Sequence, residues 1–253
     1  MNQILVFKTP ETLAGYAADL LVADIKGHQS GNRYQVALSG GSTPRLLYQA
    51  LRGSDAVDEL LRNRVEFYFS DERAVGPESE QSNYRLANLE LFAPLGISES
   101  SVFRMQGEAS DLEAEATRYE QLLRQRVGNA ADAVPQFDLI FLGMGPDGHT
   151  ASLFPDFDYD GVGKKLIAAP YVGSQKAWRL TFTPELINRA RKVVFLITGA
   201  NKGEALTKVL SSGIKGGNLP AGRIRATDTI WLLDRAATEA LVGQEINGTM
   251  REC

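Results

Sequence analysis

Cysteine is almost absent from this chain. Its one cysteine, Cys253, is the last of 253 residues. A single thiol forms neither a disulfide framework nor a cysteine metal site, which is typical of a reducing compartment. No stretch approaches the roughly 18 apolar residues of a membrane span. The opening MNQILVFKTP also lacks the basic segment and the long apolar core of a signal peptide. We therefore expect a cytoplasmic protein with no membrane partner.

Strong net charge is also lacking. The chain carries 27 basic and 31 acidic residues, a formal net charge of −4. This balance attracts neither nucleic acid nor an anionic membrane surface, although it permits a local basic pocket for a small anion. The sequence shows no internal repeat, no low-complexity tract and no linker long enough to divide it. Its length is enough to bury a sizeable core, so we expect one domain over residues 1–253.

What the chain does have is a regular alternation of apolar strands and amphipathic helices. Strands are predicted at Ile4–Phe7, Tyr34–Ser39, Val65–Ser70, Phe137–Leu142, Val193–Thr198 and Thr229–Leu233. Helical patterns lie between them, as in the four-residue recurrence of Leu13, Ala17, Leu21 and Ile25. The alternation predicts an α/β fold with a mostly parallel, doubly wound sheet and helices on both of its faces.

Local signals give finer expectations for several segments. Thr43 and Ser110 are predicted to cap helices, and Thr150 and Ser152 to cap a short one. A helix opening at Ser82-Asn83 is expected to turn three apolar residues inward, namely Leu86, Leu89 and Phe92. Further expected features are strands at Leu166–Tyr171 and Trp178–Phe182, a linker over Ala130–Gln136, a solvated His28 and frayed final residues.

The stretch FDLIFLGMGPDGHTASLFP, Phe137 to Pro155, carries the strongest sign of chemistry. An apolar strand runs into a turn whose glycines, Gly145 among them, let a ligand approach closely. Asp147 and His149 lie in this turn, where the carboxylate can orient the imidazole or favour its protonated form. An isolated histidine is more often structural than catalytic. Because parallel α/β proteins place their sites at strand ends, we nevertheless predict that His149 is a catalytic base.

A second glycine turn, Gly40-Gly41, lies between a strand and the helix that follows Ser42 and Thr43. Backbone N–H groups and the helix dipole bind phosphate at such a turn, and the two hydroxyls add donors. A tight connection alone would use glycine equally well. Lys202 lies at a similar turn, so it could face the same crevice.

Two other charged positions are candidates. Arg179, on a predicted strand, could supply an arginine fork beside the point charge of Lys202, although most such side chains are solvated. Asp71-Glu72-Arg73 follows the strand Val65–Ser70 and could be only a surface charge cluster. Its place at a strand end favours function for Asp71 and Arg73 more than for Glu72.

Cofactor patterns are missing. No histidine, cysteine and carboxylate cluster has the spacing of metal ligands, so no metal is expected. Gly40-Gly41 is not followed by the third glycine of a dinucleotide fingerprint, and no acidic residue ends the next strand in a matching unit. We therefore expect no cofactor.

Four stretches, taken together, resemble the 6-phosphogluconolactonase family. They are LSGGSTP from Leu38, SDERAVGPESEQSNYRLA from Ser70, GMGPDGHTASLFP from Gly143 and GANKGEAL from Gly199. The resemblance spans nearly the whole chain and keeps the order of the motifs. It implies a Rossmann-like α/β fold shared with glucosamine-6-phosphate deaminases. It also implies hydrolysis of 6-phospho-D-glucono-1,5-lactone in the oxidative pentose phosphate pathway, without a metal or cofactor.

The resemblance also implies roles for particular residues. Phosphate binding falls to Gly40, Gly41, Ser42 and Thr43, with Arg179 and Lys202 by similarity to the related deaminases. Arg73 and Asn83 match the substrate-side motif, and His149 matches the base. We place Gly145 with the substrate-binding residues, and Asp71, Arg73 and Asp147 with His149 in the catalytic group. The expected partner is a phosphosugar lactone, bound by a monomer or a weak homodimer.

Two other functions compete with this one. Amino-sugar phosphate deaminases resemble the chain through the Gly-Asp-Gly-His core, but they follow it with Asn-Glu-Pro, which carries a catalytic glutamate. Here the corresponding stretch is Leu153-Phe154-Pro155, which has no carboxylate. The other is a sugar-phosphate sensor, the effector domain of a transcriptional regulator. Such a sensor needs a DNA-binding segment, whereas this chain starts directly with a strand, and it would tolerate the loss of His149.

Overall fold

A seven-stranded parallel sheet forms the centre of the protein, seen in a computed structural model that describes residues 2–127, 134–211, 219–243, 246 and 248–253. Its strands follow the order β11-β1-β10-β9-β5-β2-β3, and every neighbouring pair is parallel. Their bounds are β1 Asn2–Phe7, β2 Tyr34–Leu38, β3 Val65–Phe69, β5 Leu139–Leu142, β9 Lys192–Ile197, β10 Asp228–Asp234 and β11 Thr249–Glu252. The six predicted strands are thereby confirmed, with ends shifted by one to two residues.

Each face of this sheet is buried against its own core. Along β9, Val193, Phe195 and Ile197 pack into one hydrophobic cluster, while Val194 and Leu196 pack into the other. β5 alternates in the same way. Because neither face of such a strand is exposed to water, its residues are apolar throughout, and these strands form continuous apolar runs in the sequence.

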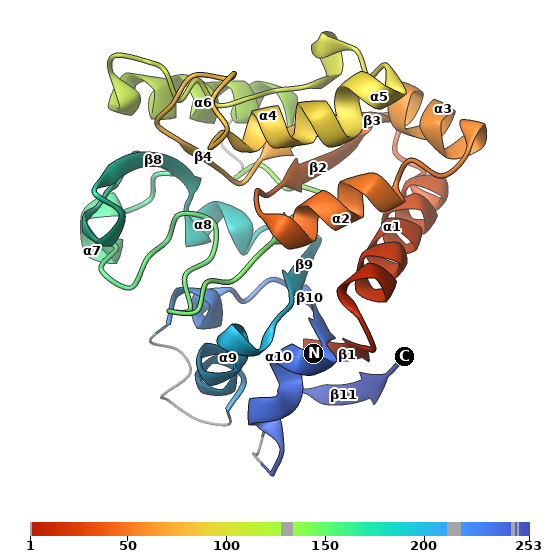
Figure 1. The fold of residues 1–253 in the computed structure, drawn as a ribbon. Coiled ribbons are helices and arrows are strands. Elements are labelled where there is room, and N and C mark those ends of the chain that lie inside the picture. The colour runs from red at the N-terminus through yellow and green to blue at the C-terminus, as the bar shows by residue number, and fades with distance from the viewer. Residues whose placement is uncertain (1, 128–133, 212–218, 244–245, 247) are drawn as a thin grey trace.

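Helices cover both faces, as the alternation predicted. One face packs against α1 Pro10–Gly27, α2 Ser42–Ala50, α3 Asp55–Arg64, α4 Asn83–Ala87 and α5 Ala93–Leu95. The other packs against α6 Leu112–Arg126, α8 Pro184–Ile187, α9 Gly203–Leu210 and α10 Arg235–Thr238. Figure 1 shows α1 and α3 on one side of the strands, and β8, α7 (Tyr159–Val162) and α8 on the other.

A small antiparallel sheet accompanies the large one. It contains β4 Asp71–Arg73, β6 Ile167–Ala168, β7 Tyr171–Val172 and β8 Ala177–Phe182. The expected single strand Leu166–Tyr171 is therefore two short strands, separated where Ala169-Pro170 interrupts the pairing. Asp71-Glu72-Arg73 was expected at the end of the strand Val65–Ser70, and it forms a separate strand, β4, paired to β8. This pairing sets Arg73 directly opposite Arg179.

Several local expectations about helices were wrong. Asp111, rather than Ser110, caps α6, because its carboxylate accepts the N–H of Ala114. Thr150 and Ser152 cap no helix; they belong to a tight turn closed by hydrogen bonds between Thr150 and Leu153. Leu89 is 53% exposed, because a π-helical turn over Asn88–Phe92 rotates it away from the side that buries Leu91 and Phe92.

Two further features differ from expectation. The helix α3 was not predicted, because Leu61 is its one fully buried residue and charged residues fill most of the rest. The final residues are not frayed: Thr249–Glu252 forms β11 at the edge of the sheet, parallel to β1. Figure 1 shows β11 beside β1, with the label C beyond the end of β11. Most of the expected linker Ala130–Gln136 lies outside the described residues.

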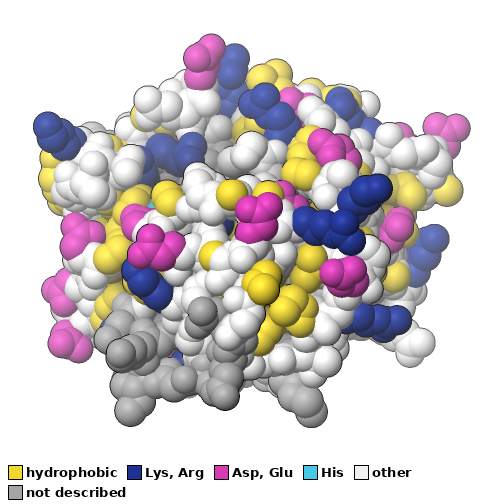
Figure 2. Space-filling model, turned by 60° about the horizontal axis from the view of Figure 1, so that its bottom comes forward, with side chains coloured by type: hydrophobic (Ala, Val, Ile, Leu, Met, Phe, Trp, Pro, Cys, Tyr) yellow, Lys and Arg dark blue, Asp and Glu magenta, His cyan; other side chains and the backbone are white. Residues whose placement is uncertain are grey.

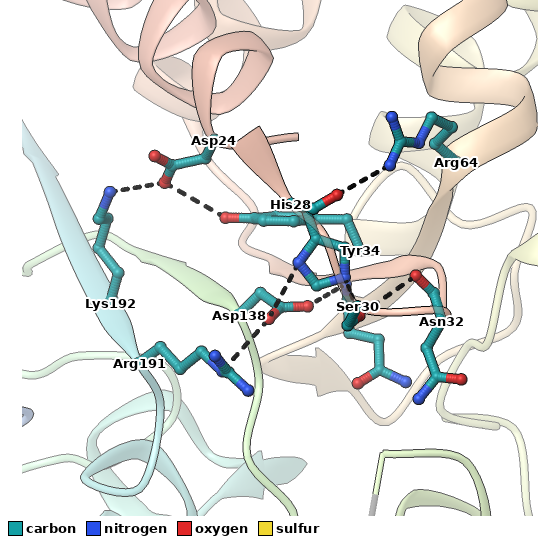
Figure 3. Close-up of polar contacts among 10 residues, drawn as sticks. Asp24, His28, Ser30, Asn32, Tyr34, Arg64, Asp138, Arg191 and Lys192 are labelled. Atoms are coloured by element: carbon teal, nitrogen blue, oxygen red, sulfur yellow. Dashed lines mark hydrogen bonds and ion pairs between the residues drawn. The ribbon is translucent and has the colours of Figure 1, made fainter. Parts of the chain in front are cut away.

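The amino ends of the strands carry a dense polar cluster around His28 (Figure 3). The His28 side chain is 11% exposed, so the expectation that it is solvated was wrong. Its Nδ1 lies 3.7 Å from Asp138 Oδ1, its Nε2 meets the Ser30 hydroxyl, and its ring stands edge-on to Tyr34. Asp138 also pairs with Arg191 and accepts the N–H of Gln35, so the cluster ties the end of α1 to three strands.

Charged side chains elsewhere on the surface are mixed in sign. On the face drawn in Figure 2, basic and acidic groups lie among one another with small apolar areas between them. In the part of the chain that the structure describes, no helix is both long and apolar enough to cross a membrane.

Candidate active site

A cleft of about 240 Å³ opens at the carboxyl ends of β2, β5 and β9. From β2 the chain proceeds to β3 on one side, and β5 later pairs with the other side of β2. The sheet therefore has its topological switch point between β2 and β5, where open α/β sheets bind ligands. The loops after these two strands are Gly40–Thr43 and Gly143–His149, and both line the cleft.

His149 lies on one wall of this cleft with its Nδ1 2.6 Å from Asp147 Oδ1. Asp147 Oδ1 also accepts the backbone N–H of His149 at 3.2 Å, so the carboxylate is held within its own loop. An imidazole that donates Nδ1–H to a carboxylate presents Nε2 as its proton acceptor. The pair therefore has the hydrogen bonding of a general base oriented by an acid. Asp147 does not line the cleft itself.

Gly145 leaves the room that this pair occupies. A Cβ at position 145 would lie 2.1 Å from His149 Nδ1 and 2.5 Å from Asp147 Oδ1. Its N–H donates to the carbonyl of His149 at 2.8 Å, which closes the loop. Glycine at this position thus permits the hydrogen bond between the two side chains.

The beginning of α2 also lines the cleft. Ser42 is the first helical residue, and Gly41 precedes it with φ of +116°. Thr43 was expected to cap this helix, but it lies inside the first turn and its hydroxyl is 2.7 Å from that of Thr198. This contact joins the first turn of α2 to the end of β9. Gly41, Ser42, Thr43 and Lys202 all line the cleft, so an anion bound here meets a helix N-terminus and an ammonium group.

A buried carboxylate anchors the turn that leads to Lys202. Asp234, 4% exposed at the end of β10, accepts the N–H of Gly199 with both oxygens, at 3.0 and 3.1 Å, and that of Ala237 at 2.8 Å. The turn that follows carries Lys202 into the cleft. Burial lowers the pKa of Lys202, and the negative charge of Asp147 opposes this effect.

Asn83 and Asp71 line the cleft as a hydrogen-bonded pair. Asn83 Nδ2 donates to the Asp71 carbonyl at 2.9 Å and to Asp71 Oδ1 at 3.1 Å, while Asp71 Oδ2 accepts the Ser152 hydroxyl at 2.7 Å. Asn83 Oδ1 is buried and has no hydrogen-bond partner among the described residues. It lies against Gly40, where an added Cβ would be 1.7 Å away, so Gly40 must lack a side chain.

Glu72 has a structural role at the start of α4. Its carboxylate, 2% exposed, accepts the N–H groups of Arg73, Asn83 and Tyr84 and the hydroxyl of Ser82, at 2.8 to 2.9 Å. Burial raises its pKa, and these hydrogen bonds oppose the rise. Glu72 binds the N-terminus of α4 and so holds Asn83 and Arg73 at the cleft.

Arg73 and Arg179 are brought side by side, but only Arg73 lines the cleft. The Arg73 guanidinium donates to the carbonyl of Gln81, whereas that of Arg179 donates to the carbonyl of Trp178 at 2.9 Å. Burial lowers the pKa of Arg179, and the positive charge of Arg73 lowers it further. The two guanidiniums thus place positive charge next to the cleft, and the carboxylates of Asp71 and Glu72 partly offset it.

The structure thus gathers nearly all of the residues predicted from sequence. Those that line the cleft are Gly40, Gly41, Ser42, Thr43, Asp71, Arg73, Asn83, Gly145, His149 and Lys202. Sequence reasoning missed the roles of Ser152, Thr198 and Asp234. An acidic residue directly between a strand and a helix was a usable signal for Asp234, but nothing local pointed to Thr198. Among the described residues, no group of three histidine, cysteine, aspartate or glutamate side chains could hold a metal ion.

Comparison with known proteins identifies the family. Residues 8–231 match the family described as glucosamine-6-phosphate isomerases/6-phosphogluconolactonase. A relative from Synechocystis, named 6-phosphogluconolactonase, is 42% identical over 207 residues, which are 81% of this chain and 84% of the relative. The chain belongs to this family.

Solved structures extend the comparison to the fold. The 6-phosphogluconolactonase of Trypanosoma brucei superposes with a TM-score of 0.81 at 30% identity, covering 95% of this chain and 99% of the other. A monomeric glucosamine-6-phosphate deaminase superposes nearly as well, with a TM-score of 0.80 at 25% identity over 94% of this chain and 99% of the other. The Rossmann-like fold implied by the motifs is therefore confirmed, and the two groups of family members share it.

Proposed function

We propose that this protein hydrolyses 6-phospho-D-glucono-1,5-lactone to 6-phospho-D-gluconate, the second step of the oxidative pentose phosphate pathway. The observation that carries the proposal is His149, whose Nδ1 is held 2.6 Å from Asp147 in the same cleft as a helix N-terminus and Lys202. A base and an anion site that line one cleft match an ester that also bears a phosphate. Curated relatives at 33–42% identity carry the name of this activity.

The chemistry follows from the ester. Neutral His149 takes a proton from water through Nε2 as the water oxygen attacks C1 of the lactone. The developing oxyanion is stabilised by Arg73 or by an N–H of the glycine loop. The tetrahedral intermediate then collapses: the bond from C1 to the ring oxygen breaks, and His149 returns its proton to that oxygen. Asp147 keeps the ring oriented and stabilises the imidazolium between these two transfers.

The phosphate is bound by Gly40–Thr43 and Lys202, with Arg179 adjoining Arg73 as a further cation. Positive groups whose pKa burial lowers gain from an anion, because the anion favours their charged form. Binding at this end orients C1 toward His149, which lowers the barrier through positioning. Asn83 and Asp71 line the same cleft and are placed to contact the sugar. Neither a metal nor a cofactor takes part in the proposed steps.

We further propose that the chain acts as one catalytic domain, because β4 of the small sheet and β2, β5 and β9 of the large one all contribute to the same cleft. A cytoplasmic setting suits the single cysteine, and a monomer or weak homodimer is sufficient, since one chain provides both ends of the site.

An assay of lactone hydrolysis tests the proposal. 6-Phosphogluconate is detected with 6-phosphogluconate dehydrogenase, and the rate is corrected for spontaneous opening of the lactone. We expect turnover well above that background. No acceleration of lactone opening, together with ammonia release from glucosamine 6-phosphate, would instead identify a deaminase. Binding of phosphosugars without turnover of either compound would indicate a sensor.

A further inference from the structure

One aromatic side chain in the cleft region has no part in the steps above. The ring of Phe154 stacks on the imidazole of His149, with centroids 4.1 Å apart and ring planes inclined by 19°. Phe154 is 6% exposed, whereas the His149 side chain is 28% exposed. One face of the imidazole is therefore covered by an apolar ring.

The turn between the two residues is closely held. The Thr150 hydroxyl donates to the Gly143 carbonyl at 2.8 Å, and the N–H of Leu153 donates to the Thr150 carbonyl at 2.9 Å. The N–H of Ser152 donates to the Thr181 hydroxyl at 3.1 Å, and Ala151 has an unusual φ of +46°. Strained backbone at a cleft persists only where its surroundings impose it. This turn brings the rings of residues 149 and 154 onto each other.

Asp147 alone leaves the imidazole one freedom. A single hydrogen bond at Nδ1 fixes that nitrogen, but the ring can still swing about the line to Asp147 Oδ1 and carry Nε2 out of line with the lactone. Contact with a flat ring over the whole imidazole face opposes this swing. The negative face of a phenyl ring also attracts the imidazolium that forms during turnover.

We propose that Phe154 is a positioning residue for His149: its stacked ring holds Nε2 toward the substrate and favours the imidazolium formed during hydrolysis. This inference rests on the function proposed above.

Three variants test it. Phe154→Leu keeps an apolar side chain but removes the ring, Phe154→Tyr restores a ring, and Phe157→Leu makes the same loss three residues away. Phe157 is partly buried and its ring meets that of Tyr159 edge-on, so it is the matched control. Melting temperatures of all three establish that they are folded.

We expect Phe154→Leu to lower kcat about tenfold with KM within about twofold, because orientation of a reacting group acts on the chemical step. Phe154→Tyr and Phe157→Leu should stay within about twofold of the wild-type kcat. Wild-type kcat in Phe154→Leu, or an equal loss in Phe157→Leu, would overturn the inference.

A second measurement does not depend on turnover. A phenyl ring stacked at 4.1 Å shifts the imidazole protons of His149 upfield in an NMR spectrum, and these signals are assignable because the chain has two histidines. The shift should be kept in Phe154→Tyr and lost in Phe154→Leu. The absence of an upfield shift in the wild type would show that Phe154 does not stack on His149, and would overturn the inference. A wild type without lactone turnover would instead contradict the proposed function, which separates the two failures.

Discussion

Two histidine–aspartate pairs lie at opposite ends of the large sheet. At the carboxyl ends of the strands, His149 and Asp147 are two residues apart, 2.6 Å from nitrogen to oxygen, in a glycine loop on a cleft. At the amino ends, His28 and Asp138 come from distant parts of the chain and are 3.7 Å apart among Ser30, Tyr34 and Arg191 (Figure 3). The first pair presents a ring nitrogen to a ligand, whereas the second joins α1 to three strands.

A histidine–aspartate pair alone therefore does not identify the catalytic site. Asp138 divides its two oxygens among His28, Arg191 and the N–H of Gln35, so it serves several partners. Asp147 Oδ1, by contrast, is hydrogen-bonded to one residue, His149, through both the ring Nδ1 and the backbone N–H. Each member of the first pair has a counterpart in the second, and the two ends can be tested with the same substitutions.

The largest contrast is expected from the histidines. His149→Ala should lower kcat for the lactone by at least about 10²-fold, because it removes the general base, with little change in affinity for 6-phosphogluconate. The coupled hydrolysis assay and product-binding calorimetry measure the two quantities. Turnover near the wild-type rate would remove His149 from the catalytic role, and an equal loss in His28→Ala would abolish the distinction between the two ends.

The aspartates should separate activity from stability. Asp147→Asn should lower kcat by about tenfold or more, since the imidazole loses the carboxylate that orients it and stabilises its cation. Asp138→Asn should leave kcat within about twofold but reduce the free energy of unfolding by about 1–3 kcal/mol, because it weakens buried hydrogen bonds to charged groups. Steady-state kinetics and urea unfolding measure these effects. The reverse assignment would contradict our reading of both pairs.

The lysines give a contrast that depends on pH. Burial lowers the pKa of Lys202, so its ammonium is lost at a lower pH than that of a solvated lysine. Affinity for 6-phosphogluconate should therefore fall as pH rises through this lowered pKa. Lys202→Arg should remove the alkaline loss, since a guanidinium stays charged, and Lys202→Ala should bind weakly at every pH. Lys192 pairs with Asp24 at 2.6 Å at the other end, and Lys192→Ala should keep the wild-type profile. A flat wild-type profile in calorimetry would argue against the anion clamp.

The smallest effect is expected from His28→Ala. Its imidazole packs against Tyr34 and reaches Asp138 and Ser30, so its loss should lower the free energy of unfolding by about 1 kcal/mol. Urea unfolding measures this change, with His149→Ala as the control that leaves stability nearly unaltered. A His28→Ala protein as stable as the wild type would mean that the amino-end cluster is not a structural tie.

Much of the fold could be predicted because its signals are local. The strands of the large sheet are buried on both faces, so their sequences are apolar throughout, as in Val193–Ile197. Thr9 and Pro10 predict the start of α1, and the structure shows the capping hydrogen bonds of Thr9. The helix α3 was missed because it buries little, and β4 was missed because a three-residue charged strand carries no apolar pattern.

The contacts of the candidate site also fall into two groups: local ones that the sequence predicts, and ones between distant parts of the chain. The sequence alone determined the Asp147–His149 pair, because two residues in one glycine loop meet whatever the rest of the chain does. It also determined the glycine turn before α2. Tertiary structure decided which distant groups meet: Asp71 with Ser152, Thr43 with Thr198, Arg73 with Arg179, and His28 with Asp138. Strand order and register set these contacts, and both arise from packing the whole chain, which no short stretch encodes.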